Sequence, residues 1–537
     1  MDTTSNSKTP ATRSSAVRSA TIGVMALAIM NVTAVVSLRG LPSEAVYGLS
    51  SVFYYLFAAV FFLIPVSIVA AELATAWPQR GGVFRWVGEA FGPRWGFVAI
   101  FLLWVESTIW FPTALTFASV SLAFVGPDQK WDEAVAANRV YTLVLVLLVY
   151  WIATFATLRG LKSAARLAKW GGMVGTIIPA GILIALGVAY MMSGKPLQMD
   201  FAWKDLVPNF SNFNNLVLAA GIFLAFAGME MNAIHVNELD DPTRNYPLAI
   251  GMASILTVAM SVFGTLAIGV IIPAAKIDVT QSLLLGFDDL FAVFGLAWAS
   301  PIMAIALAFG VLGGVTVWVA GPSAGIATVG RAGYLPPFFQ KMNKNGMAIN
   351  ILIVQGLLVT FLSVMFVVLP SVQAAYQILS QLMVTLYLIM YVMMFSAAIF
   401  LRFSQPNTPR PYKVPFGKAG MWIFGGVGLI GSLIAFVLSF VPPSQIAVGS
   451  PTAYIAFLIG GNIFFLAIPL VIYAIRKPYW RTVEGTELFE PFTWEKEGRH
   501  PGTEQGTQPA AAAAVAASAA LPTQGVAATP VAAANKP

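Results

Sequence analysis

The sequence predicts an all-α integral membrane protein with about twelve transmembrane helices. Of its 537 residues, 58% are hydrophobic and only 10% are charged, whereas roughly a quarter of the residues in ordinary soluble domains are charged. Between about residue 20 and residue 476 one apolar run follows another, and several exceed the roughly 20 residues that a helix needs to cross the hydrocarbon core. A single water-soluble core could not bury all of these runs.

The order of the apolar runs predicts three regions along the chain. Residues 1–19 form a polar N-terminal tail, residues 20–476 hold the twelve helices, and residues 477–537 form a second tail. The first apolar stretch lacks the small-residue cleavage pattern of a signal peptide, so it is expected to remain as the first helix. The spans are expected near residues 20–40, 46–75, 95–125, 140–158, 169–193, 213–236, 247–273, 293–322, 349–369, 373–401, 419–441 and 452–476.

The distribution of basic residues predicts the orientation of these spans. Six of the 30 Lys and Arg residues fall in segments on one side of the predicted membrane, and the other 24 fall on the opposite side. Because Lys and Arg are enriched in cytoplasmic segments, both termini are expected in the cytoplasm. The net charge of +7 therefore reports topology and does not indicate a nucleic-acid partner. The six outer residues are Arg39, Lys130, Arg139, Lys195, Lys204 and Lys276.

Composition and motifs exclude several kinds of chemistry. The chain has no cysteine, so it cannot form disulfides, zinc–thiolate sites or iron–sulfur clusters. It has only two histidines, and His235 is expected to be structural because it stands alone at a helix end. The sequence shows no phosphate-binding Gly-x-x-x-x-Gly-Lys loop, and the spans show no paired aspartates, Ser–Lys pair or His-Glu-x-x-His cluster. The sequence therefore predicts no enzyme activity, no catalytic residue, no metal and no cofactor.

The C-terminal tail differs in composition from the rest of the chain. After Arg481 the sequence is rich in Ala, Pro, Thr and Gly and has few of the bulky apolar side chains that a packed core needs. Alanine runs such as residues 510–514 have no amphipathic face, which argues against a structured partner-binding role. Residues 477–537 are expected to be cytoplasmic and disordered.

Two spans contain polar or Gly-rich interruptions. The first carries Asn31, Thr33 and Ser37, and the sixth carries the sequence AFAGME over residues 225–230. If the first ten helices form two five-helix halves, these spans occupy corresponding positions, where discontinuous helices hold a substrate near the bilayer midplane. The alternative is that Gly228 permits close helix packing and that Asn31 donates a hydrogen bond to a neighbouring helix.

Three carboxylates lie within or beside the spans. Glu106 in the third span and Glu230 in the sixth are candidates to bind a substrate ammonium or to carry a proton, because an ionisable residue within a span is costly and usually functional. The alternative for both is a protonated carboxyl group that is hydrogen-bonded within the bundle. Glu72, at the inner end of the second span and close to Arg80, is expected to form a structural or gating salt bridge.

Most of the 14 tryptophans lie where interfacial belts are expected. Phe226, Trp110 and Trp318 lie deeper in their spans and are candidates for lids that close over a bound substrate. Ordinary helix packing is the alternative explanation for all three.

The residues resemble the glutamate/GABA antiporter family of the amino acid–polyamine–organocation superfamily. The similarity covers roughly residues 20–476 and leaves out the C-terminal tail. It is strongest at AAELAT (70–75), GGVF (81–84), GPRWGF (92–97), HVNE (235–238), YPLA (246–249), GPS (321–323) and KMNKNG (341–346).

This resemblance implies a LeuT-like fold with two inverted five-helix repeats and two further helices. It also implies alternating access around a central site and exchange of an amino acid for its decarboxylated amine. By analogy, the unwound part of the first span offers backbone groups to the substrate, and the sixth contributes its Gly-x-Glu sequence. The expected substrate-binding residues are Val35, Val36, Ser37, Glu106, Ser107, Phe226, Ala227, Gly228, Glu230, Gly314 and Trp318; the gating candidates are Glu72, Arg80, Trp110 and Phe226; and the proton-coupling candidates are Glu106 and Glu230.

Two departures from the family pattern affect these expectations. Gly314 replaces a carboxylate of the eighth helix, and Glu106 replaces a neutral polar residue of the third, which suggests a substrate with an additional amine or a different side chain. The Ala/Pro-rich tail lacks the basic, histidine-containing segment that closes the inner mouth in the family, so acid-activated gating is not expected here.

The sequence leaves three functions open. The first is amino acid/amine antiport in the bacterial inner membrane, with the amino acid or amine and the lipid bilayer as the expected partners. The second is proton-coupled symport of an amino acid or polyamine. The third is a transporter-like sensor that binds a ligand and signals through its tail.

Overall fold

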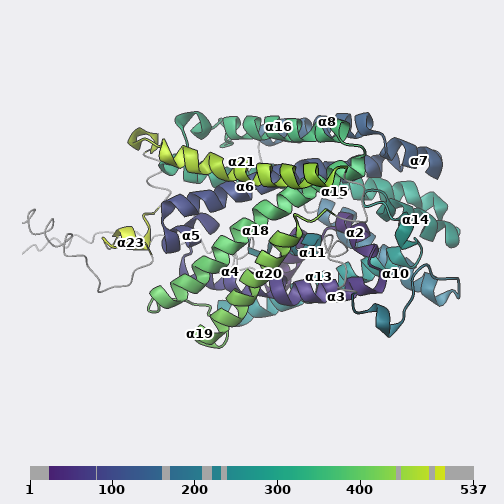
Figure 1. The fold of residues 1–537 in the computed structure, drawn as a ribbon, viewed down its shortest axis with the longest axis horizontal. Coiled ribbons are helices and arrows are strands. Elements are labelled where there is room, and N and C mark those ends of the chain that lie inside the picture. Colours follow the sequence, from purple (N-terminus) through teal and green to yellow (C-terminus); the bar gives the residue numbers. More distant parts are fainter. Residues whose placement is uncertain are drawn as a thin grey trace, which may run out of the picture.

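The computed structural model describes residues 23–79, 81–159, 170–208, 220–230, 239–442, 449–482, 490–496 and 498–501. Within these ranges the chain forms helices and no β-strand, and the helices run along one another as an elongated bundle (Figure 1). Ten of the described helices are long and apolar enough to cross a membrane, and each overlaps one of the predicted spans. The all-α membrane fold is therefore confirmed.

Several of the ten membrane helices continue through short 3₁₀ or π turns. Their bounds are Gly48–Ala76 (η2 Gly48–Ser50, α3 Ser51–Ala58, η3 Ala59–Leu63 and α4 Ile64–Ala76), α6 Pro93–Ala123, α8 Arg139–Leu158, Trp170–Met192 (with η4 Met173–Ile177 and α10 Ile178–Met192), α13 Pro242–Gly269, α15 Ser300–Val329, α16 Ile349–Ser363 with α17 Met365–Val368, α18 Val372–Ser404, Gly417–Leu438 (α19 Gly417–Gly420, η12 Met421–Gly425 and α20 Gly426–Leu438) and α21 Pro451–Ala474.

The first and sixth predicted spans are not among these ten. The first is divided into α1 (Val24–Val35) and α2 (Leu41–Ala45), and the sixth is represented by α11 (Ala220–Ala225). The rest of the sixth span lies partly outside the described residues. The other described elements are η1 Leu38–Gly40, α5 Val83–Phe91, α7 Gln129–Ala136, η5 Trp203–Asp205, η8 Ala274–Lys276, α14 Ser282–Val293, η9 Ala297–Ala299, η10 Gly330–Tyr334, η11 Pro337–Gln340, η13 Pro478–Trp480 and α23 Thr493–Lys496.

Prolines explain two of the irregular turns. Pro65 and Pro179 each follow a π-helical turn, η3 and η4 respectively. A proline inside a helix lacks the N–H for the i→i−4 hydrogen bond, and its ring clashes with the carbonyl at i−4. The wider turn before each proline accommodates the ring without ending the helix.

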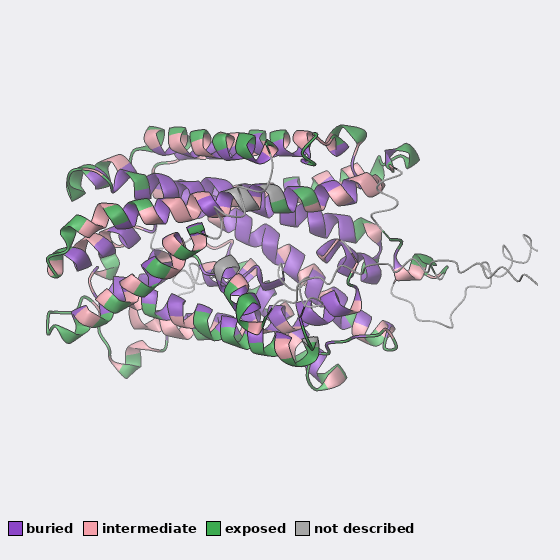
Figure 2. Ribbon diagram, turned by 180° about the vertical axis from the view of Figure 1, so that it is seen from behind, coloured by how far each residue is buried: buried purple, intermediate pink, exposed green. Residues whose placement is uncertain are grey.

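Helix α6 lies at the centre of the bundle. Nearly all of its residues from Gly96 to Ala123 are buried, and it packs against α15, α18 and α5. By contrast, α21 exposes most of its apolar residues, as expected for a helix that faces lipid. Figure 2 shows the buried residues concentrated along the middle of the bundle. Polar residues of α6 therefore face protein and not lipid.

The two ends of the bundle differ in charge. Helices α5 and α23 lie at one end, and α7 and α14 lie at the other (Figure 1). The α7 and α14 end carries Asp128, Asp132, Glu133, Asp288 and Asp289. The opposite end carries Arg85 of α5 and the basic residues of the loops that follow α15 and α18.

Asp288 on α14 gives the acidic end a pH-dependent stability. Burial raises the pKa of Asp288 from its ordinary value of 3.8 to about 6, and the charges of Asp132, Asp289 and Glu133 act in the same direction. The folded state therefore holds this proton more tightly than the unfolded state, so stability falls as the pH rises from about 4 to about 6. Asp288→Asn is expected to raise the melting temperature at pH 7.5. At pH 4 the variant and the wild type should melt together.

Glu72 connects three segments at the basic end. Its Oε1 lies 2.9 Å from Arg402 Nη1 and 3.0 Å from Arg410 Nε, and its Oε2 accepts the backbone N–H of Val414 at 2.7 Å. Glu72 is only 2% exposed. The carboxylate thus joins α4 to the end of α18 and to the loop that follows it.

Replacement of Glu72 by Gln is expected to destabilise the protein by about 3–5 kcal/mol, because it leaves buried guanidinium groups without their counter-charge. Thermal unfolding in detergent measures the effect. Glu490→Gln is the matched control, since Glu490 pairs with Lys496 at an exposed site where an ion pair contributes about 1 kcal/mol or less. Equal melting temperatures for the two variants would contradict the prediction.

The tail is ordered further along the chain than the sequence predicted. Arg85 of α5 donates from Nη1 to the carbonyl of Glu490 at 2.8 Å and from Nη2 to the carbonyl of Pro491 at 3.0 Å. Glu89 Oε1 accepts the backbone N–H and the hydroxyl group of Thr493 at 2.9 and 3.0 Å. This part of the tail therefore makes defined contacts with α5, whereas composition alone predicted disorder from residue 477 onward.

An aromatic contact explains why this segment is held in place. Phe492 is only 1% exposed and stacks on Phe84, with ring centres 5.5 Å apart. It also lies against Gly88, where an added Cβ would sit 2.4 Å from the ring. The segment of residues 490–496 contains Phe492 and Trp494, which supply bulky apolar side chains for this contact.

Candidate functional site

The first predicted span is broken where the sequence predicted its unwound segment. Helix α1 ends at Val35, and Val36 (φ −67°, ψ 121°) and Ser37 (φ −131°, ψ 115°) are extended. The chain then resumes as η1 and α2, with Pro42 in the first turn of α2. Ser37 is exposed although its neighbours Val36 and Leu38 are buried. The backbone N–H of Val36 still donates to the carbonyl of Val32 at 2.8 Å. Backbone groups beyond it, at such a break, can be reached by a ligand.

The sixth span is broken at a glycine. Helix α11 ends at Ala225, residues 226–228 form a turn, and helical structure resumes at Met229. Gly228 has φ 109°, a conformation that residues with a side chain rarely adopt. Helix α11 also packs against η1, so the two breaks belong to one region of the molecule.

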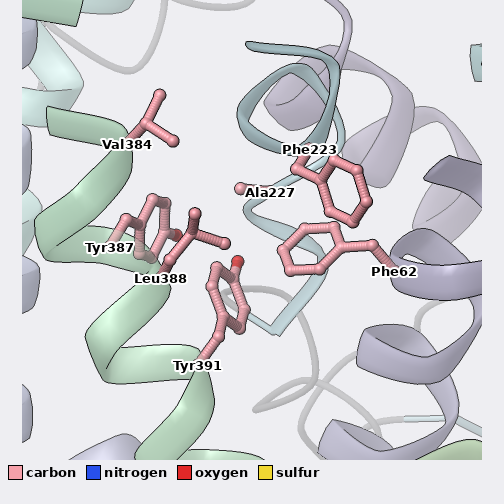
Figure 3. A pocket seen from close by; sticks show the side chains of 7 residues that line it. All are labelled: Phe62, Phe223, Ala227, Val384, Tyr387, Leu388 and Tyr391. Atoms are coloured by element: carbon pink, nitrogen blue, oxygen red, sulfur yellow. The ribbon is translucent and has the colours of Figure 1, made fainter. Parts of the chain in front are cut away.

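Glu230 links the break in the sixth span to α18 through hydrogen bonds. Its Oε1 accepts the hydroxyl of Tyr387 at 2.5 Å, and its Oε2 accepts the hydroxyl of Tyr391 at 2.6 Å. The backbone N–H of Gly228 donates to Tyr391 Oη at 3.0 Å and to Glu230 Oε2 at 3.2 Å. Figure 3 shows both tyrosines directed from α18 toward the segment that carries Ala227. Both carboxylate oxygens therefore have protein donors.

These tyrosines also line a narrow crevice that is too tight to hold a water molecule. Ala227 lies in it, which places one predicted binding residue beside the tyrosines, whereas Phe226 is fully buried against Tyr55, with ring centres 5.9 Å apart. The complete lining is Phe62, Phe223, Ala227, Val384, Tyr387, Leu388 and Tyr391 (Figure 3).

Glu106 differs from Glu230 in its hydrogen bonding. It lies in the middle of α6 and is only 4% exposed, yet its Oε2 has no hydrogen-bond partner among the described residues. The charges that act on it are those of Glu230 and Arg39. A buried carboxylate oxygen without a donor is costly unless it carries a proton or binds a cationic partner.

Arg39 is the cationic residue of this region. Its Nη1 donates to the hydroxyl of Thr113 at 3.0 Å, and its guanidinium lies 5.2 Å from the centre of the Trp110 ring. Glu106, Trp110 and Thr113 follow one another at helical spacings of four and three residues, so they share one face of α6. The assignment of Arg39 to an outer segment was therefore wrong, because its partners lie well inside α6.

Helix α15 contributes Trp318 and Gly314 to the same region. The ring centre of Trp318 lies 5.8 Å from that of Trp110. A Cβ added to Gly314, one helical turn before Trp318, would lie 4.0 Å from the Trp110 ring, with no other described neighbour within that distance. Gly314 therefore leaves open space beside Trp110. Ser107 does not share in this arrangement, because it is buried and its hydroxyl donates to the carbonyl of Trp104 in its own helix.

Glu72, also singled out in the sequence, does not belong to this region. Glu72 lies in the ion-pair cluster at the end of the bundle. Arg80 and His235 lie outside the described residues.

Sequence reasoning missed Arg39, Tyr387 and Tyr391, and also the buried carboxylate of Glu44. The tyrosines are four residues apart in a long apolar span, and such a spacing signals two hydroxyl groups on one helix face that need partners. Glu44 is only 3% exposed, and its Oε2 has no hydrogen-bond partner among the described residues. It escaped notice because the predicted spans left residues 41–45 between two helices, whereas these residues form α2.

Comparisons with known proteins agree with this architecture. The family model described as "Amino acid permease" matches residues 22–462. An uncharacterized transporter of Legionella pneumophila is 38% identical over 448 residues, which cover 83% of this chain and 95% of that protein. The glutamate/gamma-aminobutyrate antiporter of Lactococcus lactis is 32% identical over 440 residues, covering 81% and 86%. A probable agmatine/putrescine antiporter of the same species is 26% identical over 430 residues, covering 80% and 89%.

Proposed function

The chain belongs to the amino acid permease family, and on that premise we propose that it exchanges an amino acid for a decarboxylated amine by alternating access. It is a multi-pass membrane transporter of amino acids or amines. Two relatives are named for exchange of glutamate with gamma-aminobutyrate and of agmatine with putrescine. Every one of these four solutes has a cationic nitrogen group at neutral pH, so a shared ammonium site is the simplest common requirement.

The unpaired Oε2 of Glu106 is the observation that supports this function most directly. A substrate ammonium bound there would supply the missing donor and the counter-charge together, as a charge-assisted hydrogen bond. The break in the first span, from Ser37 onward, would offer backbone groups to the same substrate. Trp110, Trp318 and the space beside Gly314 would then receive the rest of the substrate.

The position of the site suits alternating access. The two broken helices and α6 meet within the bundle, so small rotations of the half-helices can open the region toward either side. Glu230 is held by Tyr387 and Tyr391, and we assign it the role of coupling the break in the sixth span to α18. Among the predicted binding residues, Glu106 is then the primary contact for the ammonium.

We place the protein in a bacterial inner membrane with both termini in the cytoplasm. The end of the bundle that carries α5 and the ordered tail is the basic one, and the end that carries α7 and α14 is acidic. This asymmetry follows the positive-inside rule. The relatives described above come from bacteria.

Proton-coupled symport is the second candidate, because a buried carboxyl group without a partner can also carry a proton. Uptake of labelled amino acids and amines into proteoliposomes separates the two functions. Exchange requires substrate inside the vesicles, so uptake should occur only into preloaded ones. Uptake into empty vesicles under an inward proton gradient would replace antiport by symport.

A further inference from the structure

Arg39 is a cation in the substrate region whose contacts within the described residues are all uncharged. It is partly buried, and it touches the neutral hydroxyl of Thr113 and the ring of Trp110. Among the described residues, no carboxylate oxygen lies within ion-pairing distance of its guanidinium. Charged residues within membrane spans are costly and normally serve a function. Glu106 acts on Arg39 through its charge without a direct ion pair, so the guanidinium can still accept an anionic ligand.

The donor geometry of the Arg39 guanidinium suits a carboxylate. It carries five N–H groups in a planar fork that matches a carboxylate in a bidentate manner. Within the described part of the chain, its hydrogen bonding is limited to the one bond from Nη1 to Thr113. Thr113 and Trp110 hold the group from one side, which leaves N–H groups on the other side to reach a ligand.

The spacing between Arg39 and Glu106 indicates what kind of solute can bridge them. Thr113, which anchors Arg39, is seven residues beyond Glu106, or about 10 Å along the axis of α6. Trp110 lies between the two levels and contacts Arg39. The charges of Arg39 and Glu106 act on each other, and their anchoring residues lie at different levels of α6. A solute whose carboxylate and ammonium are several bonds apart therefore bridges them more readily than one that carries both groups on the same carbon.

We propose that Arg39 is a specificity-determining residue that binds the carboxylate lying remote from the substrate ammonium, while Glu106 binds the ammonium. This inference rests on the proposed exchange function and adds a second recognition point to it. Arg39 thereby favours solutes that carry such a carboxylate over otherwise identical solutes in which it is neutral.

The test compares acidic amino acids with their side-chain carboxamides as competitors of exchange in proteoliposomes. The wild type should bind the carboxylate form more tightly by about 10- to 100-fold, the range for a hydrogen-bonded charge pair. Arg39→Gln should bring this ratio close to one, mainly by weakening the carboxylate form. Arg39→Lys keeps the charge but loses the bidentate geometry, so its ratio should be intermediate.

Control variants separate recognition from folding. Arg139→Gln makes the same change at an exposed arginine that donates to the carbonyls of Val367 and Leu369, and its ratio should equal that of the wild type. Thr113→Val removes the anchor but keeps the cation, so the ratio should fall only in part. Melting temperatures identify any variant that is misfolded. If Arg39→Gln is misfolded, the competitor ratios of Arg39→Lys and Thr113→Val test the role of Arg39.

Each result has a defined meaning. An unchanged ratio in folded Arg39 variants, or an equal loss for both competitors, would overturn the role of Arg39 and leave the exchange function intact. If neither competitor acts on the wild type and no exchange is seen with any amino acid or amine, the proposed function itself fails, and the role of Arg39 fails with it.

Discussion

Glu106→Gln is expected to weaken transport of amine-bearing substrates by about 10- to 100-fold. The substitution keeps the size of the side chain but removes the negative charge, and a hydrogen bond to a charged group contributes about 1.5–3 kcal/mol. Because Glu106 Oε2 has no hydrogen-bond partner among the described residues, the change breaks no internal bond of that oxygen. Concentration dependence of exchange in proteoliposomes measures the effect, which should appear mainly in KM.

The stability of this variant is an independent check. Removal of an uncompensated buried charge should leave the melting temperature unchanged or raise it. Glu133→Gln, at an exposed position of α7, is the matched control and should transport normally. If Glu106→Gln exchanges substrate with an unaltered KM but no longer responds to a proton gradient, then Glu106 carries a proton and does not bind the ammonium.

The double variant Tyr387→Phe/Tyr391→Phe is expected to destabilise the protein by about 3 kcal/mol or more. It removes the two hydroxyl donors of Glu230 and leaves a buried carboxylate with little compensation. Transport should be lost as well, because the link between Gly228 and Tyr391 holds the break in the sixth span against α18. Thermal unfolding and exchange assays measure the two effects.

A third substitution tests the cause of this loss. Adding Glu230→Gln to the double variant removes the uncompensated charge, so the triple variant should be more stable than the double variant. The single variants complete a cycle that isolates the coupling between the tyrosines and Glu230. Additive effects of the single substitutions would mean that the tyrosines stabilise the bundle through packing alone, and Glu230 would then remain a candidate proton site.

Much of the fold could be predicted because the signals are local. Ten described helices coincide with predicted spans, since hydrophobicity over about 20 residues decides whether a segment crosses the bilayer. The breaks were also visible, because Ser37 and Gly228 interrupt apolar runs near the points where the helices end. Short motifs in the chain were enough to indicate the resemblance to the glutamate/GABA antiporters, and the comparisons confirmed the family.

The predictions failed where a residue's partners are distant in the sequence. Arg39 was assigned to an outer segment, but its partners Trp110 and Thr113 lie on α6, about 70 residues further along the chain. The segment around Phe492 was expected to be disordered by composition, but a surface of α5 some 400 residues earlier receives it. A short segment with two aromatic residues gives no sign of such a surface.

The sequence by itself determined the membrane class, the approximate helix boundaries and the positions of the two breaks. Each depends on hydrophobicity or backbone preference within one stretch of chain. Only the tertiary structure decided that Glu230 has two tyrosine donors, whereas Glu106 has an oxygen without a partner among the described residues and lies near Arg39. The two carboxylates look alike in sequence, and the physical reason for their different roles is that hydrogen-bond satisfaction depends on which distant helices pack around each of them.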